Sequence, residues 1–261
     1  MTFLVIDIGN TRLKWGLYDQ AHPAARLIDH GAVVLEDIDR LWHEHWRHLA
    51  HPAGMLGCVV AGDAIKRRVE EQLQAWGLKP RWLVAGLRGA GVVNGYDHPH
   101  RLGADRWAAL VGARQQALAA RTAEAATPAA ALVIMVGTAV TIDALDASGH
   151  FLGGAIMPGF GLMLRALETG TAGLKVPMGQ ATEFPTNTSD ALTSGGTDAI
   201  AGAIERAYRR LARRAGAEPL LLMSGGAAPK LASLADELPL RIVDHLIFEG
   251  LLALAADRAP A

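Results

Sequence analysis

The chain contains the same short pattern twice: an apolar run, a glycine turn and a second apolar run. The first copy spans Phe3 to Tyr18, and the second begins near Leu132. Apolar runs rich in β-branched residues and bounded by turn residues predict β-hairpins. A shift of 128 positions places Leu4, Val5, Ile6, Ile8, Gly9 and Leu17 over Leu132, Val133, Ile134, Val136, Gly137 and Leu145. We infer that the second half of the chain repeats the first.

Both predicted hairpin turns consist of small residues, Gly9-Asn10-Thr11 in the first half and Gly137-Thr138 in the second. Glycine lets the main chain approach a ligand closely, and successive backbone N–H groups can hold a phosphate. Either turn alone is better explained as an ordinary hairpin turn. Two matched turns would hold a triphosphate from both sides, so the repeat predicts a nucleotide in a cleft between two α/β lobes.

Predicted strands and helices alternate along the rest of the chain, which is typical of an α/β fold. They include a helix from about Asp37 to Ala50 and a strand at Arg81–Val84. A long Ala-rich helix then ends before Pro128, which predicts a boundary because proline cannot continue a helix. We therefore expect an N-terminal lobe over residues 1–127 and a C-terminal lobe over residues 128–261.

The charge of the chain argues against nucleic acid and membranes as partners. Its 25 basic and 26 acidic residues nearly cancel, which leaves no positive field to attract phosphate backbones or anionic lipids. The uncharged stretch from Ala125 to Ile142 ends in β-branched residues and a turn, which favours a buried strand over a membrane helix. The first apolar segment contains Asp7 and follows no basic leader, so we expect a cytoplasmic protein.

A carboxylate, Asp7, lies at the end of the first apolar strand. An uncompensated carboxylate is costly to bury, so Asp7 should meet water, a metal ion or a hydrogen-bond donor. Mg²⁺ that accompanies nucleotide phosphates keeps several waters, so Asp7 could hold it through water. Capping of nearby turn amides is the structural alternative. Lys14 could add positive charge near the phosphates.

A third glycine turn, Ser224-Gly225-Gly226, follows an apolar strand and precedes a predicted helix. Ligands of α/β sheets usually bind at such a position, so an adenosine group could lie there. The chain has neither a P-loop nor the Gly-x-Gly-x-x-Gly motif of a dinucleotide fold in a credible context. These two nucleotide folds are therefore disfavoured.

Four motifs, in this order, resemble those of the type III pantothenate kinase family: Asp7-Ile8-Gly9-Asn10-Thr11, Gly103-Ala104-Asp105-Arg106, Gly137-Thr138-Ala139 and Asn187-Thr188. Together with Ser224-Gly225-Gly226 they span nearly the whole chain. The resemblance implies two similar lobes of the actin-like ATPase (ribonuclease H-like) and sugar-kinase fold. It also implies an ATP- and Mg²⁺-dependent homodimer that phosphorylates the primary hydroxyl of pantothenate, the first committed step toward coenzyme A.

The resemblance assigns roles to individual residues. Asp105 becomes the catalytic proton acceptor, although an acidic residue in the first turn of a helix is also favoured by the helix dipole alone. ATP would contact Asp7, Ile8, Gly9, Asn10, Thr11, Arg12, Leu13, Lys14 and Thr138, and the third glycine turn adds Gly225 and Gly226. The pantothenate pocket would contain Tyr96, Gly103, Ala104, Asp105, Arg106 and Thr188. Arg106 suits this pocket because a guanidinium binds a carboxylate with two parallel hydrogen bonds.

One position departs from the family pattern. The family has an aspartate two residues before the second Gly-Thr, and this aspartate binds a monovalent cation. Here the residue is Met135, the counterpart of Asp7 in the repeat. A thioether does not replace a carboxylate for hard cations, so a site for K⁺ or NH₄⁺ is in doubt.

Two further groups have ordinary structural explanations. His43, His45 and His48 lack the His-Glu-x-x-His spacing, so an amphipathic helix is favoured over a metal site. Cys58 lies in an apolar run and is expected to be a buried thiol.

Two other functions stay open on the sequence alone. A kinase of the same fold could phosphorylate a sugar or another small hydroxylated metabolite. A regulator could bind nucleotide without turnover, although the presence of Asp7 and Asp105 argues against it.

Overall fold

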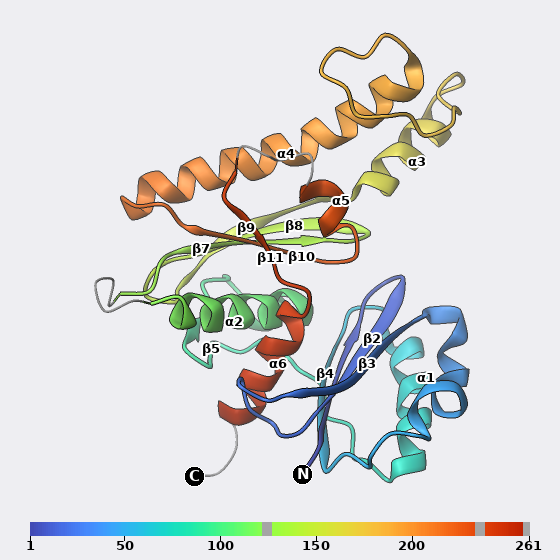
Figure 1. Cartoon of the computed structure of the whole chain (residues 1–261), viewed down its shortest axis with the longest axis vertical. Coiled ribbons are helices and arrows are strands. Elements are labelled where there is room, and N and C mark those ends of the chain that lie inside the picture. Colours follow the sequence, from blue (N-terminus) through green and yellow to red (C-terminus); the bar gives the residue numbers. More distant parts are fainter. Residues whose placement is uncertain (122–126, 233–237, 258–261) are drawn as a thin grey trace. The chain divides into compact units, whose positions relative to one another are not determined.

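The computed structural model describes residues 1–121, 127–232 and 238–257 (Figure 1). They form two compact units. The first unit contains Met1–Ala120, Gly149–Phe151 and the described part of His245–Ala261, and the second contains the described parts of Arg121–Ser148 and Leu152–Asp244. No helix among the described residues is long and apolar enough to cross a membrane.

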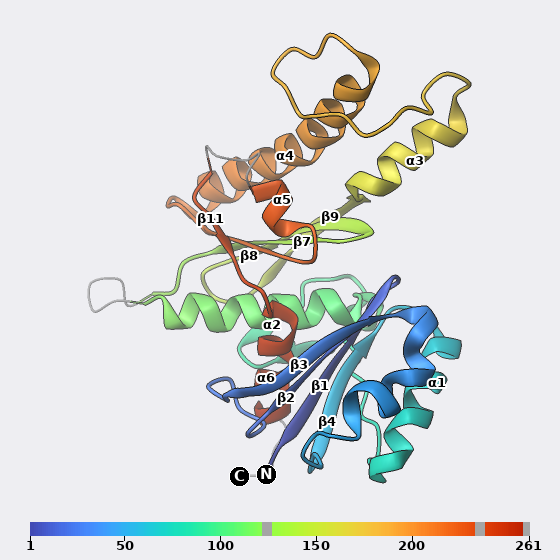
Figure 2. The same cartoon turned by 45° about the vertical axis from the view of Figure 1, so that its right-hand side comes forward.

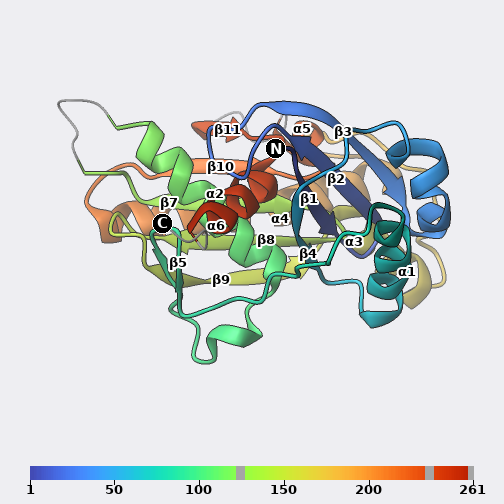
Figure 3. The ribbon, with the colours of Figure 1, turned by 90° about the horizontal axis from the view of Figure 1, so that it is seen from below.

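The two units are not simply residues 1–127 and 128–261, because each contains segments from both ranges. The last helix, α6 (Leu246–Asp257), packs against α2 (Ala104–Ala119) and so belongs to the first unit (Figure 3). The helices can approach this closely because Gly112 and Gly250 have no side chain. A Cβ at either position would lie about 2 Å from a backbone oxygen of the other helix. Residues 122–126, within the predicted boundary segment, lie outside the described residues.

The sheet of the first unit has the strand order β3-β2-β1-β4. Its strands are β1 (Phe3–Ile8), β2 (Arg12–Tyr18), β3 (Leu27–Val34) and β4 (Gly54–Val59). Successive side chains of a strand point to opposite faces. Leu4, Ile6 and Ile8 share a core with side chains of α1 (Asp63–Leu73), so Val5 and Asp7 point to the opposite face, on which α6 packs.

The predicted helix over Asp37–Ala50 is less regular than expected. The chain forms a 3₁₀ helix, η1 (Leu35–Arg40), and then a short π-helix, η2 (Trp42–Trp46). The guanidinium of Arg68 on α1 binds the backbone oxygens of Leu35 and Glu36, so these oxygens have a partner outside the helix. A long-range contact of this kind is not visible in local periodicity.

The predicted strand at Arg81–Val84 is also incorrect, because this segment makes a single parallel bridge, from Trp82 to Gly57 of β4. A short 3₁₀ helix, η3 (Gln74–Trp76), precedes this segment. Three short elements follow it: β5 (Arg88–Gly89), β6 (Val92–Val93) and η4 (Pro99–Arg101). They connect the first sheet to α2.

The sheet of the second unit repeats the order of the first, as β9-β8-β7-β10, and adds β11 (Figure 2). The strands are β7 (Ala131–Val136), β8 (Ala139–Leu145), β9 (Phe151–Pro158), β10 (Leu220–Ser224) and β11 (Leu240–Ile242). The helix α4 (Thr188–Ala215) packs on this sheet and on α3 (Phe160–Gly170), while α5 (Ala228–Ala232) follows β10. The repeated strand order agrees with the predicted duplication, and the predicted α/β class is confirmed.

The shift of 128 positions correctly relates the first strands of the two hairpins, β1 and β7. It is wrong by one residue for the second strands, β2 and β8. Ile8 pairs with Leu13, whereas Val136 pairs with Val140, so the second turn is one residue shorter. Leu17 therefore pairs with Leu4, while the residue opposite Leu132 is Ala144 instead of Leu145. The expected equivalence of Leu17 and Leu145 is wrong, because one residue fewer in a turn moves each following side chain to the other face.

Candidate active site

Asp7 lies in the middle of a row of three polar side chains across the first sheet. It pairs with Lys14 on β2 and with Cys58 on β4, so the three side chains share one face. The Cys58 thiol donates a hydrogen bond to Asp7 Oδ1 over 3.3 Å. The predicted buried thiol is confirmed, since Cys58 has no exposed surface, but its contact with Asp7 was not expected.

The environment of Asp7 disfavours its charged form. Burial raises the pKa of Asp7 from 3.8 to about 6; the hydrogen bond from Cys58 lowers it, the charge of Asp105 raises it, and Lys14 lowers it. Asp7 nevertheless keeps some exposed surface. A half-buried carboxylate with an elevated pKa is typical of a functional site, because a cation bound there would offset the cost of its charge.

Asp105 lies in the first turn of α2, in the same unit as Asp7. Its Oδ1 accepts a hydrogen bond of 2.8 Å from the backbone N–H of Arg106, so the carboxylate does stabilise the start of the helix. The charge of Asp105 also raises the pKa values of Asp7 and Cys58. The helix-dipole explanation and a role beside Asp7 are therefore compatible.

Arg106 is buried beside two aromatic rings. Its guanidinium carbon lies 5.7 Å from the ring centre of Tyr96 and 5.9 Å from that of Phe151, and the two rings stack 6.1 Å apart. Buried Asn94 fixes the loop that carries Tyr96, since it accepts a hydrogen bond from the Tyr96 N–H and donates to two backbone oxygens. Tyr96 and Arg106, both expected in the pantothenate pocket, thus lie against each other in the first unit.

The first hairpin turn does not require glycine for its own structure. Gly9 lacks a positive φ, and an added Cβ would meet only Arg12 O, at an ordinary 3.5 Å. Gly137 also lacks a positive φ, and a Cβ added to it would meet only Ala139 O, at 3.7 Å. A ligand that approaches the backbone is a better reason for glycine at both turns than the fold is. The side chains of Ile8 and Leu13 lie in the core, so only their backbone can reach a ligand.

The second unit brings its hairpin turn together with the third glycine turn. Gly159 N–H donates to Thr138 O over 2.9 Å. Gly225 has a φ of +114°, and a Cβ there would lie 2.2 Å from Val136 O at the end of β7. Gly225 is therefore required by the fold, whereas Gly226 has open space around it.

A largely apolar cavity of about 350 Å³ lies in the second unit, beside these turns. Val136 of β7, Phe160 of α3, Thr197 of α4 and Ala227 line it. Its volume is within the range of small-ligand pockets.

Thr188 is the first residue of α4, and it is exposed. The side chain of Asn187 caps this helix by accepting a hydrogen bond of 3.0 Å from the N–H of Asp190. Thr188 lies in the second unit, whereas Tyr96, Asp105 and Arg106 lie in the first. The contribution of Thr188 to a substrate pocket stays a prediction.

A sequence model of the type III pantothenate kinase family matches residues 3–210. A relative described as a type III pantothenate kinase, from Leptothrix cholodnii, is 62% identical over 261 residues, covering 100% of this chain and 99% of the relative. Another from Acidovorax ebreus is 58% identical over 258 residues, covering 99% and 98%. The chain belongs to the type III pantothenate kinase family.

Solved structures with low sequence identity share the fold of this family member. A protein from Sinorhizobium meliloti assigned as a 2-dehydro-3-deoxygalactonokinase aligns with a TM-score of 0.60 at 14% identity, covering 99% of this chain and 100% of that one. The ethanolamine utilization protein EutJ from Carboxydothermus hydrogenoformans aligns with a TM-score of 0.56 at 10% identity, covering 98% and 90%. The predicted actin-like ATPase and sugar-kinase fold is confirmed.

The structure of this family member reveals three supporting residues that sequence reasoning missed: Cys58, Asn94 and Phe151. Cys58 donates a hydrogen bond to Asp7, and Phe151 packs against Tyr96 and Arg106. Asn94 holds the loop of Tyr96 through its buried amide. The Asn-Gly dipeptide at Asn94 is a turn signal that could have drawn attention to the loop. No local signal connects Phe151 to Tyr96.

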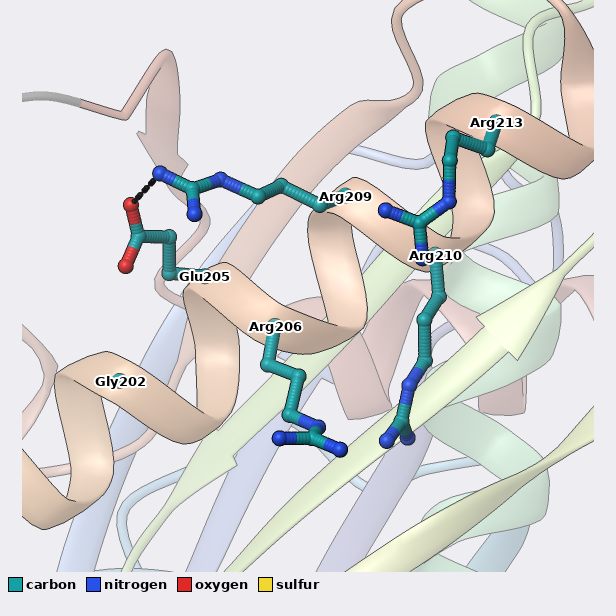
Figure 4. Close-up of a pocket in the computed structure, with 6 residues that line it drawn as sticks. All are labelled: Gly202, Glu205, Arg206, Arg209, Arg210 and Arg213. Carbon is teal, nitrogen blue, oxygen red and sulfur yellow. Dashed lines mark hydrogen bonds and ion pairs between the residues drawn. The ribbon is translucent and has the colours of Figure 1, made fainter.

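This family member has two further polar groups, the histidines within residues 43–48 and a row of arginines on α4. Among the described residues, no set of three His, Cys, Asp or Glu side chains is placed to hold a metal ion. A hollow of about 410 Å³ on α4 is lined by residues that include Arg206, Arg209, Arg210 and Arg213. Figure 4 shows these four side chains extending from α4. Glu205 pairs with Arg209. Arg213 lies in the last turn of α4, where the helix dipole favours a cation, whereas Arg206 and Arg209 lie too far from the helix end for this effect.

Proposed function

We propose that this protein transfers the terminal phosphoryl group of ATP to the primary hydroxyl of pantothenate, in the first step of coenzyme A synthesis. Membership of the type III pantothenate kinase family supports this function. The structural observation that carries it is that one unit holds both carboxylates, Asp7 on β1 and Asp105 in the first turn of α2, the latter next to buried Arg106. Phosphoryl transfer requires these parts: a carboxylate near the metal, a carboxylate for the nucleophile and a cation for the substrate.

In the proposed reaction, the pantothenate hydroxyl oxygen attacks the γ-phosphorus of ATP. The bond between the γ-phosphorus and the bridging oxygen breaks, ADP leaves, and the hydroxyl proton passes to Asp105. Since the transition state of phosphoryl transfer is loose, the main contribution of Asp105 is to orient the hydroxyl. Arg106 binds the pantothenate carboxylate, and Tyr96 packs against the guanidinium.

Asp7 fits a Mg²⁺ ion held through water. Its carboxylate is half-buried, its pKa is raised by burial, and Cys58 is its one hydrogen-bond donor among the described side chains. Mg²⁺ bound with ATP takes few protein ligands, so a single carboxylate is sufficient. When bound, Mg²⁺ neutralises charge on the phosphates. Lys14 lies in the same row and adds a positive charge.

ATP is proposed to contact both hairpin turns. The Gly9 N–H is bonded to Arg12 O over 3.0 Å, so Gly9 gives access to the backbone and does not itself donate. Thr138 at the second turn, Gly226 and the cavity beside Val136 are proposed to bind the rest of the nucleotide. We propose no K⁺ or NH₄⁺ ion at Met135.

We also propose a homodimer in the cytoplasm. Several large apolar side chains of the second unit are exposed on β9, on α3 and on the segment before α4, including Ile156, Leu162, Met178 and Phe184. Exposed apolar patches of this kind are typical of interaction sites. Size-exclusion chromatography with light scattering measures the mass directly, and a monomer at micromolar concentration would contradict the dimer.

An assay of coupled ATP consumption tests the proposed activity, with pantothenate beside a panel of sugars and short hydroxy acids. We expect turnover with pantothenate alone. Turnover with a sugar instead would indicate a different acceptor on the same fold. Binding of ATP without turnover of any acceptor at any Mg²⁺ concentration would favour a regulator.

A further inference from the structure

The single cysteine of the chain, Cys58, has no role in the proposed reaction, yet its thiol contacts Asp7. We propose that Cys58 is a positioning residue, whose thiol hydrogen bond holds the Asp7 carboxylate in the orientation that binds the water shell of Mg²⁺·ATP. This inference rests on the proposed function, because it assigns Asp7 to the metal. It concerns only the first unit, in which both residues lie.

The sheet determines the position of the thiol. Asp7 and Cys58 are partners in the parallel pairing of β1 with β4, and neighbouring strands lie about 4.8 Å apart. Both residues follow core positions on the opposite face, Ile6 on β1 and Gly57 on β4, so their side chains point the same way. The distance of 3.3 Å from Sγ to Oδ1 is a normal one for a sulfur donor.

The thiol acts as a donor and not as a thiolate. The thiol is fully buried with its Sγ 3.3 Å from Asp7 Oδ1, and an ordinary cysteine thiol is protonated at neutral pH and donates a weak hydrogen bond. A buried cysteine of this kind is unreactive, which leaves the hydrogen bond as its chemical contribution.

The hydrogen bond occupies one of the two oxygens of Asp7. Among the described residues no other side chain donates a hydrogen bond to Asp7, and Lys14 acts on it through charge. Oδ2 is then left for a water ligand of the metal. Because a thiol is a weak donor, it fixes the carboxylate while withdrawing little of its negative charge. Partners that orient ligating carboxylates in this way strongly affect metal affinity.

The test compares three substitutions of Cys58 with one control. Cys58→Val removes the donor and keeps an apolar β-branched side chain suited to a strand, and Cys58→Ala removes it with a smaller side chain. Cys58→Ser restores a donor. Leu56→Val is the matched control, since Leu56 is buried on the same face of β4 and pairs with Val5 instead of Asp7.

The first measurement is the affinity for ATP by isothermal titration calorimetry, with Mg²⁺ and with EDTA. Mg²⁺ should increase the affinity of the wild type for ATP, and we expect this increase to be about 3- to 10-fold smaller in Cys58→Val and Cys58→Ala. This is at or below the low end of the effects typical of residues that orient a metal ligand. The Mg²⁺ concentration for half-maximal turnover should rise by the same factor, while KM for pantothenate stays unchanged. Cys58→Ser should return both values to within about twofold of the wild type.

Three outcomes would overturn the positioning role. They are an unchanged Mg²⁺ dependence in both Cys58→Val and Cys58→Ala, an equal change in Leu56→Val, and a failure of Cys58→Ser to restore the Mg²⁺ dependence. Thermal melting without ligand separates these effects from unfolding, and Cys58→Ala serves if Cys58→Val does not fold. A wild-type protein that does not phosphorylate pantothenate contradicts the proposed function instead, and calorimetry still tests Cys58.

Discussion

Met135 occupies, in the hairpin of the second unit, the position that Asp7 occupies in the hairpin of the first. Asp7 pairs with Lys14 and Cys58, and Met135 pairs with the equivalent Thr141 and Ser224. The hydroxyl oxygen of Thr141 is buried without a hydrogen-bond partner among the described residues. The duplicated sheets thus keep the same framework but only one acidic centre.

The thioether of Met135 predicts that the enzyme does not depend on potassium. A hard monovalent cation needs oxygen ligands, and the central one of this row is missing. Replacing K⁺ with Na⁺ at constant ionic strength should change kcat by less than about twofold. Strong activation by K⁺ would show that other residues supply the ligands.

Asp7 should make the metal-free protein less stable as the pH rises. Its pKa is about 6 in the folded protein and 3.8 ordinarily, so the folded state binds the proton more tightly. Stability therefore falls between about pH 4 and pH 6, by at most ~3 kcal/mol and by about 1–2 kcal/mol after allowance for the remaining exposure of Asp7.

Asp7→Asn should remove this dependence. Urea unfolding in EDTA should give the two proteins similar free energies of unfolding near pH 4, with Asp7→Asn the more stable above pH 7. A difference that does not change with pH would contradict the elevated pKa.

Asp105→Asn should lower kcat by about 100-fold or more while the affinity for ATP stays the same, because a positioned acceptor for the substrate hydroxyl is lost. Asp63→Asn is the matched control, since Asp63 is also in the first turn of a helix. If both variants lose activity equally, or if Asp105→Asn loses none, the catalytic role is wrong. Steady-state kinetics and ATP titration provide both values.

Gly9→Ala should weaken ATP binding without unfolding the protein. The turn has room for a Cβ, so the melting temperature should change little, while a methyl group would obstruct a phosphate at the backbone. We expect KM for ATP to rise by about 10-fold, the cost of roughly one lost contact to a charged group. Gly202→Ala on α4, with open space around it, is the control. Equal KM values for ATP in all three proteins would place the phosphates elsewhere.

Arg106→Lys should raise KM for pantothenate by about 10-fold, because lysine loses the two-pronged hydrogen bond and the stacking on Tyr96 and Phe151. KM for ATP should stay unchanged. Arg101→Lys, at an exposed neighbouring position, should behave like the wild type. A selective change in KM for ATP would instead assign Arg106 to the nucleotide.

The sequence predicted the hairpins and the long helices because their signals are local. Continuous apolar runs rich in β-branched residues predicted β1 and β7, and the helix predicted from about Asn187 to Ala215 matches α4. The short motifs were sufficient to indicate the family. Local signals did not predict the irregular helices at Leu35–Arg40 and Trp42–Trp46, where side chains of α1 bond to the backbone: Arg68 to the oxygens of Leu35 and Glu36, and Gln72 to the N–H of Trp42.

The sequence by itself determined which chemical groups the protein has: Asp7, Asp105, Arg106 and paired glycine turns, with Met135 in place of a second acid. Only the tertiary structure decided which of them act on one another. It placed Cys58 against Asp7 through the pairing of β1 with β4, and Phe151 against Tyr96 and Arg106. These contacts join residues that are far apart in the chain, and hydrogen bonding and burial at such sites depend on the complete packing of the unit.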